Sequence, residues 1–251
     1  MDNVKLTQII QGLNTAFINQ NIASDISYRP QFISNDYKEG KKVIASIEEE
    51  LLTCDEFTIS VAFITMGGIT PLLQTLKELE NRGVQGKILT TDYLMFSEPK
   101  ALKLLSEFEN IQLKMYVTRG TKEGFHTKGY IFKKGDVYKI IVGSSNMTLS
   151  ALTTNREWNT KIVSTTEGEY SQSIEAEFAQ LWNSQNALTY QQFIDDYTLL
   201  YTNIKMIENQ KMVAIRAKEA SVEAYSLKPN SMQVSFINNL KKMYDEGEEK
   251  A

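Results

Sequence analysis

Residues 126–146 read HTKGYIFKKGDVYKIIVGSSN, and this stretch decides the fold. It contains two strand-like apolar runs, residues 129–132 and 137–142, separated by Lys-Lys-Gly-Asp, a composition typical of a tight turn. We therefore predict an antiparallel hairpin that turns at residues 133–136. Such a hairpin brings the start of its first strand and the end of its second strand to the same place.

The sequence on either side of the hairpin alternates between helical and strand patterns. Before the hairpin, apolar residues at helical spacing separate three apolar runs that predict strands, at residues 57–64, 86–91 and 111–118. Strands that are joined through helices pair in parallel. After the hairpin, residues 157–165 predict one more strand and residues 170–181 predict a closing helix. We therefore expect an α/β fold with a mixed parallel and antiparallel sheet, covered by helices on both faces.

The strand signal ends at Trp182, and helical, polar sequence continues from there to the last residue. We predict a compact domain over residues 1–185, followed by a helical segment over residues 186–251. The aromatic residues between Tyr190 and Tyr201 have helical spacing, which favours packing in a core.

The composition excludes several kinds of site. The chain has one histidine, His126, and one cysteine, Cys54, so it cannot by itself build a Cys/His zinc site or a disulfide. We expect no metal and no cofactor at its catalytic site, and we interpret Cys54 as a small apolar residue. No apolar run reaches the roughly 18 residues of a membrane span, and no signal-peptide core follows Met1. We therefore expect a cytoplasmic protein without a membrane partner.

The two ends of the hairpin carry side chains suited to phosphoryl transfer. His126 and Lys128 are two apart on a strand and point to the same face, and Ser144 and Asn146 project together in the same way. A neutral imidazole can attack phosphorus, while a lysine and neutral donors stabilise the charge on the phosphoryl oxygens. Glu157, at the start of the next strand, can hydrogen-bond an imidazole and orient it. Protonation of the leaving oxygen calls for a second imidazole, and this chain has one.

These residues resemble the half-motif of the phospholipase D superfamily, in which two such motifs meet across a twofold axis. The resemblance rests on His126-x-Lys128, residues 143–146 and Glu157, and it covers roughly residues 25–185. It implies a metal-independent phosphodiesterase that forms a covalent phosphohistidine intermediate. Members with one motif per chain complete the site by homodimerising, which implies a homodimer through the active-site face.

One position departs from the pattern of the superfamily. An Asp usually follows the lysine by five residues, and this chain has Lys133 there. The single-motif restriction endonucleases of the superfamily lack that Asp as well, so the resemblance implies a nuclease that acts on DNA. Two alternatives stay open. One is a catalytically inactive domain that dimerises and positions DNA for a helicase, and the other is an enzyme of phospholipid head groups, although no amphipathic surface helix suits a bilayer.

Basic residues are concentrated around the first half of the hairpin. Residues 111–139 contain seven Lys or Arg against two acids, a local charge of +5 in a protein of net charge −4. The phosphate backbone of a nucleic acid binds to such a patch. We predict nucleic-acid contacts at Arg119, Lys122 and Lys133.

A second resemblance lies near the C-terminal end. Residues 227–233 (LKPNSMQ) resemble the adenine-reading Q-motif that precedes the phosphate-binding loop of superfamily 2 helicases. The chain itself contains no G-x-x-x-x-G-K-[ST] loop. We therefore expect the N-terminal part of a helicase or restriction-type protein, with ATP and Mg²⁺ bound only by a region beyond this sequence.

Overall fold

The computed structural model describes residues 2–19, 21, 23–121, 123–223 and 231–245. Internal contacts divide the chain into two units, Met1–Thr202 and Asn203–Ala251. The first unit contains the sheet and every residue of the predicted catalytic motif.

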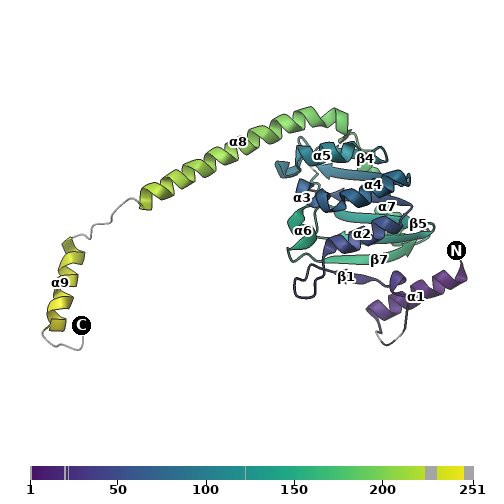
Figure 1. The fold of residues 1–251 in the computed structure, drawn as a ribbon, viewed down its shortest axis with the longest axis horizontal. Helices are drawn as coiled ribbons and strands as arrows, with labels where there is room; N and C mark the ends of the chain where they lie inside the picture. The colour runs from purple at the N-terminus through teal and green to yellow at the C-terminus, as the bar shows by residue number, and fades with distance from the viewer. Residues whose placement is uncertain (1, 20, 22, 122, 224–230, 246–251) are drawn as a thin grey trace. The chain divides into compact units, whose positions relative to one another are not determined.

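The first unit is built on one mixed sheet (Figure 1). Within the described residues its strands lie in the order β1-β7-β6-β5-β2-β3-β4-β8. β2, β3 and β4 pair in parallel, and all the other neighbours pair antiparallel. The strands are β1 (Gln31–Ile33), β2 (Glu56–Val61), β3 (Gln85–Thr91), β4 (Ile111–Tyr116), β5 (Lys128–Lys134), β6 (Val137–Gly143), β7 (Asn159–Thr165) and β8 (Ala187–Thr189). The predicted mixed α/β sheet is therefore confirmed.

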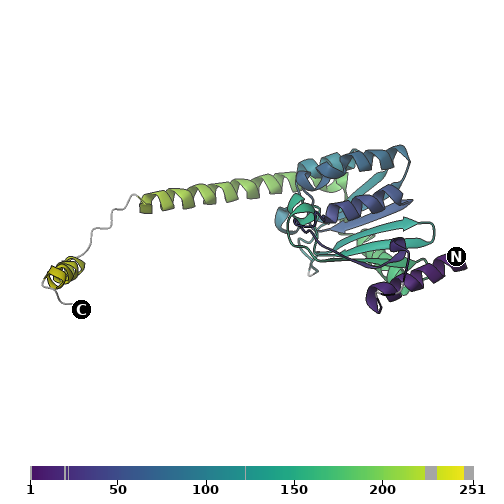
Figure 2. The ribbon, with the colours of Figure 1, turned by 60° about the horizontal axis from the view of Figure 1, so that its bottom comes forward.

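Helices cover both faces of this sheet, as predicted. α2 and α4 lie on one face and α7 lies on the other (Figures 1 and 2). The helices of the first unit are α1 (Asn3–Phe17), α2 (Val43–Thr53), α3 (Met66–Ile69), α4 (Leu73–Asn81), α5 (Pro99–Ser106), α6 (Leu149–Thr153) and α7 (Glu169–Trp182), with the 3₁₀ turns η1 (Ile26–Tyr28), η2 (Thr70–Leu72) and η3 (Tyr93–Met95).

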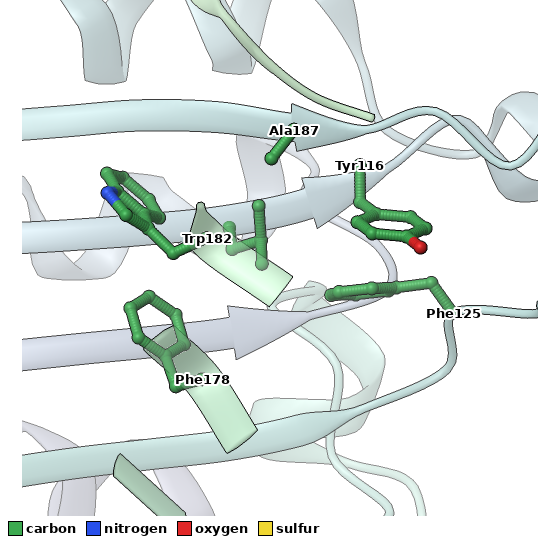
Figure 3. Packing of buried hydrophobic residues seen from close by; sticks show 6 residues of the cluster. Tyr116, Phe125, Phe178, Trp182 and Ala187 are labelled. Atoms are coloured by element: carbon green, nitrogen blue, oxygen red, sulfur yellow. The ribbon is translucent and has the colours of Figure 1, made fainter. Parts of the chain in front are cut away.

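One core cluster anchors the segment that leads into the motif (Figure 3). The cluster consists of Leu89, Tyr116, Phe125, Phe178, Trp182 and Ala187. Phe125 stacks on Tyr116 with the ring centres 5.5 Å apart. Because Phe125 immediately precedes His126, the burial of its ring fixes the start of the motif against the sheet.

A buried ion cluster joins α2 to the antiparallel half of the sheet. Glu50 of α2 is buried and lies 3.0 Å from the ammonium of Lys161 on β7 and 2.8 Å from that of Lys139 on β6. Lys161 is buried as well, so its charge depends on the carboxylate of Glu50 for compensation.

The strand pattern continues past Trp182, so the prediction that it ends there is wrong. β8 pairs antiparallel with β4, with Leu188 opposite Met115. A strand of three residues is too short to show a two-residue period, which is why the sequence pattern did not reveal it.

The compact unit also extends beyond residue 185. α8 (Tyr190–Glu223) begins directly after β8, and its residues Phe193 and Tyr197 are buried, as their spacing predicted. The hydroxyl of Tyr197 donates to the backbone carbonyl of Ser97 at 2.7 Å. The first turns of α8 therefore belong to the packed unit, which ends at Thr202.

The second unit contains the remainder of α8 and α9 (Ser231–Asp245). Of the stretch that resembles a Q-motif, residues 227–230 lie outside the described residues, and residues 231–233 begin α9. Among the helices that the structure describes, none combines the length and the apolar character required to cross a bilayer.

Candidate active site

The hairpin brings the predicted motif residues to one edge of the sheet. β5 and β6 pair along their whole length, and the residues between them form the turn. Lys128 at the start of β5 therefore lies beside the end of β6, from which Ser144 and Asn146 follow. His126 precedes β5 and lies outside the strand, so the prediction that both residues lie on the strand is correct only for Lys128.

Lys128 and His126 are in direct contact. The Lys128 ammonium lies 2.6 Å from Nδ1 and 3.1 Å from Nε2 of the imidazole, and it donates to the His126 carbonyl at 2.9 Å. Burial and the adjacent positive charge of Lys128 together lower the pKa of His126 below its ordinary value. Burial also lowers the pKa of Lys128, partly offset by the negative charge of Glu157. The lowered pKa favours the neutral imidazole, the form in which it is a nucleophile.

Asn146 is oriented by a backbone partner. Its Oδ1 accepts the N–H of Phe63, which follows β2, at 3.1 Å. The N–H of Met147 in turn donates to the Phe63 carbonyl at 3.0 Å. Hydrogen bonds in both directions thus join the loop after β2 to the loop after β6. Because the oxygen of Asn146 is used in this way, its NH₂ group is the part that can donate to a ligand.

Ser144 and Glu157 bind each other. The Ser144 hydroxyl donates to the Glu157 carboxylate, and its oxygen accepts the backbone N–H of Trp158 at 3.1 Å. We expected Ser144 to donate to phosphate and Glu157 to orient the imidazole. A hydroxyl has one hydrogen, so Ser144 can bind a phosphoryl oxygen only by leaving Glu157. Within one chain, the described side chains therefore form two pairs. Glu157 accepts a hydrogen bond from Ser144, and His126 contacts Lys128.

Gly143 has a role that the motif pattern alone does not reveal. A Cβ atom at this position would lie 2.2 Å from the Trp158 carbonyl oxygen and 2.6 Å from the Asn159 Cα. Asn159 is buried and donates through Nδ2 to the Ser145 hydroxyl at 2.9 Å. The end of β6 and the start of β7 thus approach closely only because residue 143 lacks a side chain.

Two aromatic rings lie side by side next to the imidazole, and sequence analysis did not identify them. Phe63 and Tyr93 each lie 5.9 Å from His126, measured between ring centres, and Phe96 lies 5.0 Å from Phe63. Phe63 follows β2 and Tyr93 follows β3. These strands pair in parallel, so their carboxyl ends share an edge, which is the signal that could have located the rings.

Part of the predicted basic patch lies away from the motif. Arg119 lies 3.9 Å from the carboxylate of Asp92, and Lys122 lies outside the described residues. Lys133 is at the far end of β5, about 16–17 Å along the strand from Lys128, and five residues put it on the opposite face. Two further lysines of the stretch bind elsewhere, Lys114 to the Trp182 carbonyl and Lys139 to Glu50. Lys133 and Lys139 therefore do not share one surface with the motif, because adjacency along a strand is not adjacency in space, and nucleic-acid contacts at Arg119, Lys122 and Lys133 stay predictions.

A hollow of about 300 Å³ adjoins the motif. Ser60, His126 and Lys128 line it from the strands, and Ile174, Phe178 and Leu181 line it from α7. A second hollow, of about 400 Å³, is lined by residues that include Cys54, Phe132 and Lys134, at the opposite end of β5. Burial raises the pKa of the Cys54 thiol to about 11, as suits an apolar residue and not a nucleophile. In the part of the chain that is described, no three His, Cys, Asp or Glu side chains gather in a way that could hold a metal ion.

Comparison with known protein families shows the family to which the chain belongs. The family described as "Cardiolipin synthase, PLD-like domain" matches residues 52–182, just over half of the chain. The chain therefore belongs to this phospholipase D-like family of phosphodiester-processing proteins, which confirms the resemblance read from the motif.

Several solved structures are similar to the chain, with low sequence identity. NucT from Helicobacter pylori is 14% identical and Nuc from Salmonella typhimurium, a phospholipase D family member, is 17% identical. Each match covers 64% of this chain, with 98% and 99% of the respective relatives, at a TM-score of 0.49. Phosphatidylserine synthase from Haemophilus influenzae is 14% identical over 74% of this chain and 46% of that chain, at a TM-score of 0.48. Such likenesses define no substrate for this chain. A search of curated proteins found no match.

Proposed function

We propose that this chain is a metal-independent phosphodiesterase that cleaves DNA in an active site shared by two subunits. The observation that carries the proposal is the contact of the His126 imidazole with the ammonium of Lys128 at an edge of the sheet that also presents the Asn146 amide. DNA as the substrate rests on the single-motif resemblance.

The proposed reaction has two displacements at phosphorus. In the first, a ring nitrogen of the neutral His126 of one subunit forms a bond to phosphorus, the bond from phosphorus to the leaving oxygen breaks, and the protonated His126 of the partner subunit gives that oxygen its proton. In the second, water attacks phosphorus, the partner's His126 takes a proton from the water, and the bond to the nucleophilic imidazole breaks.

Lys128 and Asn146 stabilise the phosphoryl oxygens in this proposal. The ammonium of Lys128 moves from the imidazole to the phosphate, because an anion is a stronger acceptor than a neutral ring. That movement also frees the ring nitrogen for attack. Asn146 donates through its NH₂ group, and Ser144 joins it as a donor when its hydroxyl leaves the Glu157 carboxylate.

The direct test is cleavage of single- and double-stranded DNA in the presence of EDTA, with the His126→Ala variant measured in parallel. We expect cleavage by the wild type and none by the variant. Cleavage that requires a divalent cation, or that survives the substitution, contradicts the proposal.

A mixing experiment tests the shared site separately. Wild type and His126→Ala subunits are refolded together in equal amounts, and activity is compared with wild type at the same total concentration. If each site needs two histidines, only wild-type homodimers are active and about a quarter of the activity remains. About half remains if each subunit acts alone, and a strictly monomeric mass in solution contradicts the shared site as well.

The inactive alternative gains no support from the motif. It was suggested by Lys133, which lies at the other end of β5 and removes no group from the surroundings of His126. The helicase context, with its ATP and Mg²⁺, stays a prediction, because residues 227–230 of the stretch that suggested it lie outside the described residues.

A further inference from the structure

Exposed aromatic side chains border the catalytic motif on both sides along the sheet edge. Along this edge the strands lie in the order β7-β6-β5-β2-β3. The residues beside the strand ends at this edge are, in the same order, Trp158, Ser144, His126, Phe63 and Tyr93. The phosphoryl-binding groups therefore lie in the middle, with aromatic rings on either side. Neighbouring strands are about 4.8 Å apart, so the row spans about 19 Å.

The rings on the β3 side form a stepped surface next to the imidazole. Phe63 and Tyr93 are nearly parallel, with an angle of 10° between their planes and 6.4 Å between their centres. Tyr93 is 41% exposed, although it packs against Phe63 and His126. Phe96 is also exposed and meets Phe63 edge to face. An aromatic ring that is packed on one side and open on the other offers a flat face to a ligand.

The backbone that presents these rings is strained and held at both ends. Leu94 and Met95 have φ angles of 55° and 50°, a region that costs a residue with a side chain about 1–2 kcal/mol. Before them, the Asp92 carboxylate accepts the N–H of Thr118 at 2.7 Å. After them, the Ser97 hydroxyl accepts the N–H of Ile64 at 3.1 Å. Such strain persists where the surroundings enforce it, and it is concentrated at ligand-binding sites.

The ring on the β7 side is Trp158, the residue after Glu157. Its backbone N–H is bonded to Ser144, so the chain is fixed beside the motif, yet its side chain is 73% exposed. Phe32 of the edge strand β1 meets it edge to face, with 6.0 Å between ring centres. A second pair of aromatic rings thus follows Glu157 in the chain, beside Ser144.

We infer that these two aromatic surfaces stack the bases of an unpaired nucleic acid strand, one on each side of the phosphate that His126 attacks. The inference rests on the proposed function and names its substrate class. In a nucleic acid both substituents of the phosphodiester carry a planar base, which matches rings on both sides. In a phosphatidyl ester of a small head group, acyl chains lie on one side only. A duplex buries the faces of its bases within its own stack, so the rings favour a single strand.

The test is a cycle of binding measurements made with the His126→Gln protein, which does not cleave. A short fluorescent single strand is compared with the same strand lacking the two bases that flank its central phosphate. We expect Tyr93→Ala and Trp158→Ala each to weaken binding of the intact strand roughly 5- to 150-fold, the effect of one lost base stack. Neither should weaken binding of the abasic strand, whereas Tyr93→Phe should retain the wild-type affinity.

The matched control is Tyr170→Ala. Tyr170 is 39% exposed, close to the value for Tyr93, but it lies at the start of α7, near the end of β7 that is remote from the motif. Its removal should leave both affinities unchanged.

Three results overturn the inference. Substitutions at Tyr93 and Trp158 that weaken both strands equally, or neither, exclude stacking. A shift of the variants to a lower solution mass identifies a subunit contact instead, and loss of binding to phosphatidylglycerol vesicles with unchanged strand binding identifies a lipid surface. If His126-dependent cleavage occurs but the substitutions weaken both strands equally or neither, only the inference fails. If the substitutions weaken binding of the intact strand alone and no cleavage occurs, only the proposed function fails.

Discussion

Asn146→Asp separates the two tasks that the structure gives this side chain. The Oδ1 of Asn146 accepts the Phe63 N–H at 3.1 Å, and its NH₂ group is the donor proposed for the phosphoryl oxygen. A carboxylate keeps the acceptor and replaces the donor with a second, negatively charged oxygen. The substitution should therefore leave the fold intact and impair the reaction.

The expected magnitudes follow from these two contacts. Removal of one donor to a developing oxyanion lowers the rate about 10²- to 10³-fold, and the added negative charge acts in the same direction. Thermal stability should be unchanged, because the Phe63 N–H keeps its acceptor. In Asn146→Ala that partly buried N–H loses its acceptor, at a cost of about 1–3 kcal/mol. For a unit of this size, the cost corresponds to a fall in Tm of roughly 2–12 °C.

The assay combines single-turnover cleavage in EDTA with thermal unfolding followed by circular dichroism. Cleavage by Asn146→Asp within a few-fold of the wild-type rate refutes the role of the amide as a phosphoryl donor. A Tm for Asn146→Asp as low as that of Asn146→Ala refutes the orientation of the amide toward Phe63.

Three more predictions concern protonation, buried charge and backbone packing. Because the chain has one histidine, a single imidazole NMR signal reports His126; its pKa should lie below 6.5, and Lys128→Met should raise it by removing a like charge. Since the reaction needs one neutral and one protonated imidazole, cleavage should fall as the pH drops below that pKa and also as it rises well above it. A wild-type signal that titrates at or above 6.5 contradicts the argument. Glu50→Ala leaves the buried Lys161 uncompensated and should lower the free energy of unfolding by about 3–5 kcal/mol in urea titrations, whereas Glu39→Ala, which removes an exposed pair with Lys41, should not change it measurably. Gly143→Ala forces β6 away from the Trp158 carbonyl and should cost about 1–3 kcal/mol together with most of the cleavage activity, while Gly129→Ala in the same hairpin, where a Cβ meets no atom within 4 Å, should retain the wild-type Tm. Equal Tm values for the two glycine variants would show that the close approach at residue 143 is not important.

The hairpin and four motif residues could be predicted because their information is local. A tight-turn composition between two apolar runs sets the pairing, and the pairing brings His126 and Lys128 to Ser144 and Asn146. Glu157 reaches the same place because the next strand pairs with the hairpin. Its hydrogen bond to Ser144 could not be predicted, since spacing along the chain does not specify which side-chain groups bind each other.

Residues that are remote in sequence were harder to place. Phe63 and Tyr93 contact His126 because crossovers of the chain bring their strands to the same edge of the sheet. An alternation of apolar and polar residues does not indicate which aromatic rings remain exposed. Lys133 and Lys139 illustrate the reverse error, because they are close to Lys128 in sequence yet occupy other parts of the sheet. Charge summed over a segment predicts a surface only when the fold keeps that segment on one face.

The contact between Lys128 and His126 has a consequence for which molecules can react. In this structure each group satisfies the other, so neither is available until a ligand offers the ammonium a better acceptor. A phosphodiester anion does so, whereas an uncharged ester of similar shape offers no comparable attraction. Selection for negative charge would thus precede any recognition of bases, and the nucleophile would be exposed only when an anion is bound.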